Sequence, residues 1–455
     1  MLGWLVSSAL AAPNLILVSM DTTRVDALSA YTSFVGPNRW ETRTTPTIDG
    51  LAAEGVRFTH FYANAPTTLN SHTTMFTGLD PHEHGVVRNG YPFVESDPTL
   101  ASRLSDEGYD TIAILGAAAL ERAMGLGTGF RVYDDEMPDL KSIMYQDDAE
   151  GVVERAFAHL DAREGDEPLF LFVHFYDAHA PYTPPPWMRK RFVDPEYDGL
   201  LVRRGPGLRT HVQRMRKDAA DPADTAHLGG LYLAEIAYID EQIGVLLAGL
   251  EERGLLEEAL LVITADHGET LADDPMYAYS HGSNVEEDVM HIPLVMRGYG
   301  VDLPEGVVVE SQAAMPGLAP TLQQILGFER SLGEHPDFFD MLRPGPVWDE
   351  DGWPERPTHV AFVEASRPRA QETTTGWNNL RLHRGVFAGG YGYWTGPWLK
   401  KQPTEWYVEP EAGDDAVFRE LSHLVEGWDA RAPAYRPVQV APATQEALEA
   451  LGYVD

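Results

Sequence analysis

The chain contains 455 residues, of which 70 are acidic and 34 are basic, so its formal net charge is −36. A hydrophobic content of 44% with 10% aromatic residues is enough to form a large core, which excludes a wholly disordered chain. The negative charge argues against nucleic acid as a partner, because a phosphate backbone needs clustered lysine and arginine. The absence of cysteine excludes disulfide bonds, thiolate metal ligands and cysteine nucleophiles.

The first twelve residues have the pattern of a signal peptide. Residues 2–10 are mostly apolar, and the small residues Ala11 and Ala12 follow them. No lysine or arginine precedes the apolar run, so a short lead-in to the first strand is the alternative. The pattern favours a periplasmic or secreted protein over a cytoplasmic one. No apolar run reaches the roughly 20 residues that a membrane-spanning helix needs.

Strand-like apolar runs alternate with helical patterns as far as residue 343. In chain order we predict a strand over Asn14–Met20, helices over 45–55 and 97–108, strands over Thr111–Leu115 and Leu169–Tyr176, a helix over about 225–253, and strands over Leu260–Thr264 and Ile292–Met296. The two shorter helices each open with a capping residue before proline and stop at glycine. This alternation predicts an α/β fold with a large, mostly parallel sheet between helical layers.

The pattern changes in the last quarter of the chain. Residues 344–356 are rich in proline, glycine and acidic residues, and we predict a linker there. Residues 359–364 and 381–394 have the glycine-punctuated pattern of a small antiparallel unit, and a terminal helix is expected near 444–451. The predicted organisation is therefore a catalytic domain over 13–343 and a small C-terminal subdomain over 357–455.

Polar side chains follow several of the predicted strands. Asp21 comes directly after the first strand, Asp266-His267-Gly268 after the strand at 260–264, and Asp177 and His179 after the strand at 169–176. Open α/β sheets bind ligands at the carboxyl ends of their strands, so these side chains are expected to converge. An adjacent Asp-His pair can hold one cation through an oxygen and a nitrogen.

Several motifs in this order resemble the sulfatases of the alkaline phosphatase superfamily. They include PNLILVSMDTTRVDAL, the segment TPTIDGLAAEGVRFTHFYANAPTTLNSHTTMFTGLDPHEHGV, FLFVHFYDAHAPYTPP, LVITADHGE and HGSNVEEDVMHIPLVMRG, and the resemblance runs from about Pro13 to Asp455. It implies an alkaline-phosphatase-like α/β sandwich with a smaller C-terminal subdomain. It also implies one divalent metal ion held by Asp21, Asp266 and His267 beside a nucleophile at the start of a helix.

By position, the resemblance puts Thr68 in the nucleophile place and His72 in the place of a motif arginine. Sulfatases carry a cysteine or serine there that is oxidised to formylglycine, and this chain has T-L-N-S-H instead. Thr68 resembles the nucleophile of phosphonate hydrolases, nucleotide pyrophosphatases and phosphoethanolamine transferases of the same superfamily. Thr68 and Thr22 are then further candidate metal ligands, with Thr22 standing where many relatives place another carboxylate or amide.

The resemblance also gives roles to three more residues. Asn89 would donate to a non-bridging oxygen of the substrate, while His179 and His281 would contact the anion or protonate the leaving group. An imidazole near its reference pKa of about 6.5 suits that acid role. The metal is left open among Ca²⁺, Mn²⁺, Zn²⁺ and Mg²⁺, because the donor set does not select one of them.

Three functions follow as alternatives. The first is cleavage, by hydrolysis or transfer, of a small anionic phosphate or phosphonate ester, most of all a diester, through a Thr68 alkoxide and a covalent intermediate. The second is sulfate-ester hydrolysis without formylglycine, and the third is a non-catalytic binding protein that keeps the fold and the metal site. The oligomeric state is not predicted.

Overall fold

The computed structural model describes residues 12–31, 43–86, 88–94, 97–137, 147–199, 221–272, 279–329, 331–342, 359–366, 381–388, 391–395 and 415–431. Residues 1–11 of the predicted signal peptide, the linker at 344–356 and the helix near 444–451 lie outside the described residues. Among the described helices, none is both long enough and apolar enough to cross a membrane.

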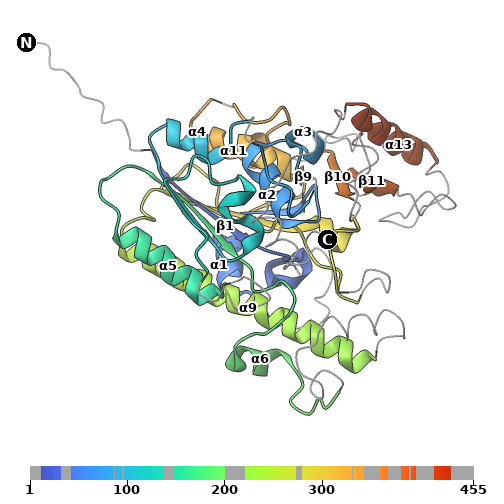
Figure 1. Cartoon of the computed structure of the whole chain (residues 1–455), viewed down its shortest axis with the longest axis horizontal. Coiled ribbons are helices and arrows are strands. Elements are labelled where there is room, and N and C mark those ends of the chain that lie inside the picture. Colours follow the sequence, from blue (N-terminus) through green and yellow to red (C-terminus); the bar gives the residue numbers. More distant parts are fainter. Residues whose placement is uncertain are drawn as a thin grey trace, which may run out of the picture.

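A nine-stranded sheet forms the centre of the molecule (Figure 1). Its order is β4-β3-β5-β1-β6-β7-β2-β8, and the short β9 also pairs with β2. The strands are β1 (Asn14–Met20), β2 (Val56–Tyr62), β3 (Asp110–Leu115), β4 (Val132–Asp134), β5 (Leu169–Phe175), β6 (Ala259–Thr264), β7 (His291–Tyr299), β8 (Val307–Val309) and β9 (Ala313–Ala314). β7 is antiparallel to both of its neighbours and the other pairings are parallel, which confirms the mostly parallel sheet.

Helices cover both faces of this sheet (Figure 1). One layer contains α1 (Pro46–Glu54), α5 (Ala149–Asp161) and α9 (Pro222–Glu252), and the other contains α2 (Thr68–Thr77), α4 (Leu100–Asp106) and α11 (Leu318–Ile325). Successive side chains of β1 point to alternate faces of the sheet. Leu15 and Leu17 pack in one core, and Ile16 and Val18 pack in the other. Both faces are thereby buried, as expected of a parallel sheet.

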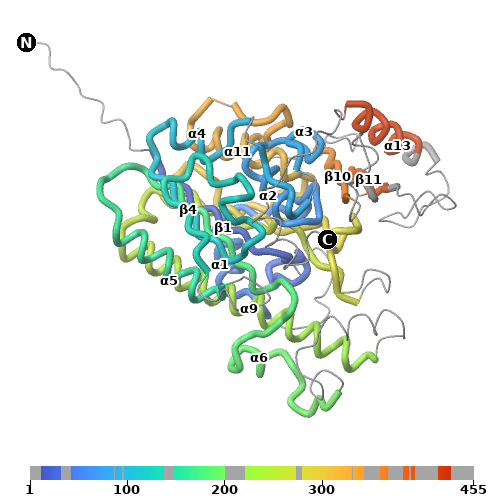
Figure 2. Tube along the Cα trace, in the orientation of Figure 1, coloured from blue at the N-terminus to red at the C-terminus, as the bar shows by residue number. Residues whose placement is uncertain are grey.

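A separate antiparallel sheet of β10 (Ala361–Ser366), β11 (Arg381–Ala388) and β12 (Tyr391–Thr395) confirms the small C-terminal unit. Figures 1 and 2 show this unit and α13 (Asp415–Asp429) beside α3 (Pro81–His84) at one end of the molecule. Phe387 of β11 stacks on Tyr62 of the large sheet with a centroid distance of 4.6 Å. The two sheets therefore share a core.

Some predicted boundaries were wrong. The helix expected from residue 97 begins at Leu100, because Thr99 rather than Asp97 caps it by accepting from the Ser102 N–H. The helix expected from about 225 begins at Pro222, after the cap Asp221. The sequence analysis did not predict β2, which carries the chain to α2, or α13.

Candidate active site

The proposed metal ligands lie together at the carboxyl edge of the large sheet. Asp21 follows β1 and Asp266 follows β6, and these two strands are paired in parallel, so their ends are neighbours. Ligand atoms of Asp21, Asp266 and His267 all lie within 4.8 Å of one another, and the three residues are fully buried. The structure thus brings together the three residues that the sequence analysis selected.

Four buried side-chain atoms at these strand ends make no hydrogen bond. Asp21 Oδ1, Asp266 Oδ2, His267 Nε2 and Thr22 Oγ1 are buried and make no hydrogen bond. His267 Nδ1 lies 2.9 Å from the Gly268 carbonyl oxygen and must donate to it, which leaves the Nε2 lone pair free. Two carboxylates, an imidazole and a hydroxyl fit a divalent cation, because each unpaired atom is a metal ligand.

Electrostatics within the cluster also favour a cation. Burial raises the pKa of Asp21 to about 6, although His267 opposes this. Burial and the nearby Asp21 raise the pKa of Asp266 in the same way. The pKa of His267 is raised because Asp266 and Asp21 outweigh its burial. A bound divalent cation would favour the ionised form of both carboxyls and lower these pKa values.

Hydrogen bonds to Asp266, Tyr232 and Glu269 hold the loop after β1 in place. Thr22 has a φ of 52°, which is uncommon for a β-branched residue. Its N–H donates to Asp266 Oδ1 at 3.2 Å, and its carbonyl accepts from the Tyr232 hydroxyl at 2.8 Å. The same hydroxyl accepts from the Arg24 N–H at 3.0 Å, and the Arg24 guanidinium donates to the Glu269 carbonyl and to Asp26. Arg24 thus ties the β1 loop to the Asp266 loop.

Thr68 is the first residue of α2 and is fully buried. Its side chain is close enough to Asp21 to lower the pKa of that carboxyl, and Asn89 Nδ2 lies 3.4 Å from its Oγ1. Asn89 Oδ1 accepts from the Leu69 N–H at 2.7 Å, so Asn89 also fixes the first turn of α2. The Thr68 oxygen therefore lies between the metal-ligand cluster and an amide donor, at a helix N-terminus that favours negative charge.

His72 is held by its own hydrogen bonds. Its Nδ1 donates to the Thr68 carbonyl at 2.7 Å, and its Nε2 accepts from the Ser19 hydroxyl at 2.8 Å. Burial lowers its pKa to about 3, so it is neutral. The imidazole connects α2 to β1 behind the nucleophile position, and both ring nitrogens are occupied.

His179 and His281 lie on the more exposed side of the cluster. Their ring centroids are 5.0 Å apart, His179 stacks on Tyr176, and His281 is 4.6 Å from the His267 ring. His281 Nδ1 lies 3.3 Å from both Glu269 carboxylate oxygens. The expectation of an ordinary imidazole pKa was wrong: burial and His267 lower the pKa of His281 to about 3, and burial and His281 lower that of His179.

Two residues of the site were missed by the sequence analysis. His174 of β5 is fully buried, with its Nε2 3.2 Å from Asp21 Oδ2. Glu269, buried three residues after Asp266, faces His281. His174 falls inside an apolar run, so only its polarity in a buried strand could have indicated it, whereas Glu269 directly follows the Asp-His-Gly motif.

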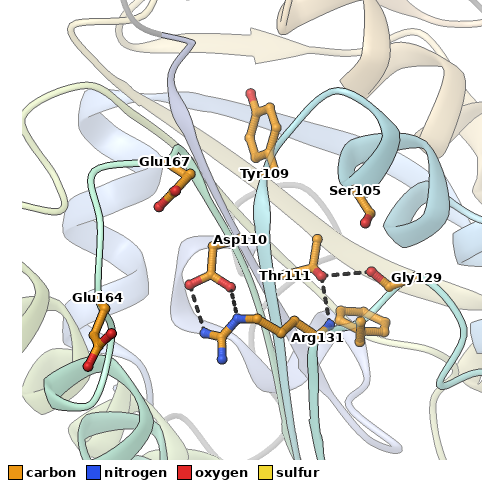
Figure 3. A pocket seen from close by; sticks show the side chains of 9 residues that line it. Ser105, Tyr109, Asp110, Thr111, Gly129, Arg131, Glu164 and Glu167 are labelled. Carbon is orange, nitrogen blue, oxygen red and sulfur yellow. Dashed lines mark hydrogen bonds and ion pairs between the residues drawn. The ribbon is translucent and has the colours of Figure 1, made fainter.

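A separate pocket of about 510 Å³ lies at the opposite edge of the sheet (Figure 3). Its lining includes Tyr109 and Asp110 at the amino end of β3, together with Arg131, Glu164 and Glu167. Figure 3 shows the Arg131 guanidinium paired with Asp110. The lining contains none of the strand-end residues above, so this pocket is distinct from the candidate site.

Comparisons with known proteins agree with this fold. The Sulfatase family model matches residues 13–327, which is more than half of the chain. An uncharacterized sulfatase, YidJ, of Escherichia coli is 24% identical over 70% of this chain and 68% of its own length. The multifunctional alkaline phosphatase superfamily protein PehA of Trinickia caryophylli is 24% identical over 70% of this chain and 74% of its own.

The architecture is also that of solved structures. The phosphonate monoester hydrolase of Agrobacterium radiobacter superposes with a TM-score of 0.67 at 21% identity, over 93% of this chain and 96% of the other. The fold is thus alkaline-phosphatase-like, and enzymes of this kind are hydrolases that typically depend on a divalent metal. From the family match and the shared architecture, the chain belongs to the sulfatase family.

Proposed function

We propose that this hydrolase cleaves phosphate or phosphonate esters, most of all diesters, and that Thr68 is its nucleophile. The observation that carries the proposal is the fully buried Thr68 at the start of α2, which lies close enough to Asp21 of the metal-ligand cluster to lower the pKa of that carboxyl. The chain has no cysteine, so a formylglycine derived from cysteine is excluded. A threonine hydroxyl needs a base or a metal to act as a nucleophile, and this position offers a metal.

Asp21, Asp266 and His267 would hold the cation, with Thr68 and Thr22 as further oxygen ligands. When bound, a divalent cation would lower the pKa of the Thr68 hydroxyl and neutralise charge on the substrate oxygens. The donor set suits Mn²⁺ or Zn²⁺ and admits Ca²⁺ or Mg²⁺.

The proposed reaction has two displacements at phosphorus. The ionised Thr68 Oγ1 attacks phosphorus, an O–P bond forms, and the bond from phosphorus to the leaving-group oxygen breaks. That oxygen takes a proton from the imidazolium of His179 or His281. Water, or an acceptor alcohol in a transferase, then displaces Thr68 from phosphorus and returns a proton to the imidazole.

Neighbouring groups support the build-up of negative charge. Asn89 Nδ2 would donate to a non-bridging oxygen, and the N-terminus of α2 would favour the negative charge. An anionic substrate would raise the lowered pKa values of His179 and His281, which then become acids in the complex. His72 would keep α2 in place without contacting the substrate.

Sulfate-ester hydrolysis is the second candidate, and the family match and the name of the Escherichia coli relative favour it. It requires the same metal-ligand cluster, but the attacked atom is sulfur instead of phosphorus. A binding protein without turnover is the third outcome of the test below.

The test compares wild type, Thr68→Ala and Thr68→Ser with aryl phosphodiester, phosphonate monoester and aryl sulfate substrates, with each of the four cations supplied. We expect phosphodiester or phosphonate turnover that Thr68→Ala reduces by at least about 10³-fold, while Thr68→Ser keeps part of it. Intact mass with a slow substrate should show a phosphoryl adduct on the wild type. Turnover of sulfate alone, or undiminished phosphodiester turnover in Thr68→Ala, would reject the proposal.

A further inference from the structure

His174 of β5 contacts the candidate metal ligand Asp21 from the neighbouring strand. The parallel register pairs Ser19 of β1 with His174, and the Asp21 N–H extends this ladder by donating to the Phe175 carbonyl at 2.9 Å. His174 Nε2 lies 3.2 Å from Asp21 Oδ2, and both side chains are fully buried. The hydrogen bond is therefore shielded from water, where such a bond is strong.

This hydrogen bond has a defined direction when Asp21 is ionised. A carboxylate only accepts hydrogen bonds, so the shared proton belongs to His174 Nε2. His174 Nδ1 is buried and makes no hydrogen bond in the described chain. A proton on Nδ1 would be a buried donor without an acceptor, so a neutral ring with its proton on Nε2 fits both nitrogen atoms.

The two carboxylate oxygens of Asp21 differ in their surroundings. Oδ2 accepts from His174, whereas Oδ1 is buried and makes no hydrogen bond. Carboxylates that bind a metal are commonly held by a hydrogen bond from a neighbouring side chain, which fixes their orientation. The contact with His174 thus leaves Oδ1 as the oxygen available to a cation.

We propose that His174 is a positioning residue, which holds the Asp21 carboxylate through Oδ2 and so presents Oδ1 to the divalent cation. This inference rests on the metal-ligand cluster of the proposed function, and not on Thr68 or on the kind of ester that is cleaved. His174 itself contacts neither the cation nor the substrate.

Three substitutions of His174 separate its hydrogen bond from its packing. The amide N–H of His174→Gln can take the place of Nε2, that of His174→Asn can take only the place of Nδ1, and His174→Leu has no donor. Calorimetry titrates Mn²⁺, Zn²⁺, Ca²⁺ and Mg²⁺ into each metal-free protein. For the cation that the wild type binds most tightly, we expect His174→Asn and His174→Leu to weaken binding about 10- to 100-fold, and His174→Gln to recover most of this loss.

His84→Leu is the matched control for the loss of a buried imidazole. His84 Nδ1 accepts from the Val86 N–H at 3.1 Å, and its Nε2 lies 3.1 Å from Thr74 Oγ1, so its partners lie outside the metal-ligand cluster. The control should have a lower Tm than the wild type and the same cation affinity. An equal loss of cation affinity in His84→Leu and His174→Leu would show a general effect on the fold and would overturn the inference.

Pulsed EPR of the Mn²⁺-loaded protein distinguishes a positioning residue from a metal ligand. We expect nitrogen coupling from one imidazole, that of His267, in the wild type and equally in His174→Gln. A second imidazole coupling that His174→Gln removes would make His174 a ligand and would overturn the inference. Cation affinity in His174→Asn within about twofold of the wild type would overturn it as well.

These readouts do not depend on turnover. If the variants follow the expected order while the wild type cleaves none of the esters, the inference stands and the proposed function fails. If the wild type cleaves phosphodiesters through Thr68 and His174→Leu binds the cation as the wild type does, the inference fails and the proposed function stands. A wild type that binds none of the four cations would overturn both.

Discussion

At the scale of single residues, the site is defined by buried side-chain atoms that make no hydrogen bond. Asp21 Oδ1, Asp266 Oδ2 and His267 Nε2 are buried, make no hydrogen bond and lie close to one another. Buried polar atoms are nearly always hydrogen-bonded, so a cluster of exceptions indicates a missing ligand. The charges agree with this, since two buried carboxyls with raised pKa values and one imidazole supply the ligands of a divalent cation.

Metal affinity should therefore depend on pH. The pKa of Asp21 is raised from 3.8 to about 6, so this carboxyl is protonated below that pH and ionised above it. A cation competes with the proton on Asp21 and with those on Asp266 and His267, whose pKa values are also raised. The apparent affinity for Mn²⁺ should therefore rise as the pH increases from 5 to 8. Titration calorimetry from pH 5 to pH 8 measures this.

Asp266→Asn provides the control for that experiment. It removes one charged ligand and should weaken Mn²⁺ binding at every pH. An affinity for the wild type that does not change between pH 5 and pH 8 would contradict the assignment of Asp21 as a ligand.

At the scale of elements, α9 holds the loop after β1 in place through hydrogen bonds. Its Tyr232 is fully buried, and the hydroxyl both donates to the Thr22 carbonyl and accepts from the Arg24 N–H. This bond holds Thr22 in its unusual backbone conformation, with φ at 52°. The longest helix of the described chain is thus coupled to the metal loop through one hydroxyl group.

Tyr232→Phe should leave two buried backbone groups without a partner. We expect the free energy of unfolding to fall by about 1–3 kcal/mol and Mn²⁺ binding to weaken, because the Thr22 loop loses its fixed position. Urea unfolding and calorimetry measure the two effects. Tyr299→Phe on β7 is the matched control, since no described residue bonds to the Tyr299 hydroxyl, and an equal effect of both variants would contradict this role.

The sequence predicts strands and helices better than it predicts long-range side-chain contacts such as that of the Tyr232 hydroxyl. Asp21 and the Asp-His pair were found because each follows a strongly apolar run, and that local pattern also placed β1 and β6. Tyr232 occupies one position in a long apolar helix face, and nothing near it in sequence shows that its hydroxyl reaches residue 22, which is 210 positions away. The low pKa of His281 likewise depends on His267 and on burial, both of which arise only in the folded chain.

At the scale of the whole molecule, a buried polar cluster joins the small C-terminal unit to the main domain. Trp428 of α13 is fully buried and donates from Nε1 to Asp80 Oδ2 at 2.7 Å, across 348 positions of sequence. His335 Nε2 lies 3.3 Å from the same oxygen and 3.6 Å from Glu83 Oε2. Trp428 also stacks on Phe362 of β10, so both C-terminal elements meet the main domain here.

The Asp80–His335 pair should make stability depend on pH at both ends of the scale. Burial opposes the ionised form of Asp80, but His335 outweighs it and lowers the pKa from 3.8 to about 2. Burial likewise opposes the charged form of His335, but Asp80 and Glu83 raise its pKa from 6.5 to about 10. The contribution of the pair is thus complete between about pH 4 and 6.5, and it is lost as the pH falls through 2 or rises through 10.

His335→Gln tests this coupling between the two parts of the molecule. Near pH 6 the variant should lose about 2 kcal/mol of unfolding free energy, and the difference from the wild type should shrink as the pH approaches 10, because the wild-type imidazole then loses its proton. Urea unfolding followed by Trp fluorescence at several pH values measures the difference. His423→Gln on α13 is the control, since that side chain is exposed and pairs only within its own helix. A deficit in His335→Gln that stays constant from pH 6 to pH 10 would mean that packing, and not the ion pair, holds the C-terminal unit in place.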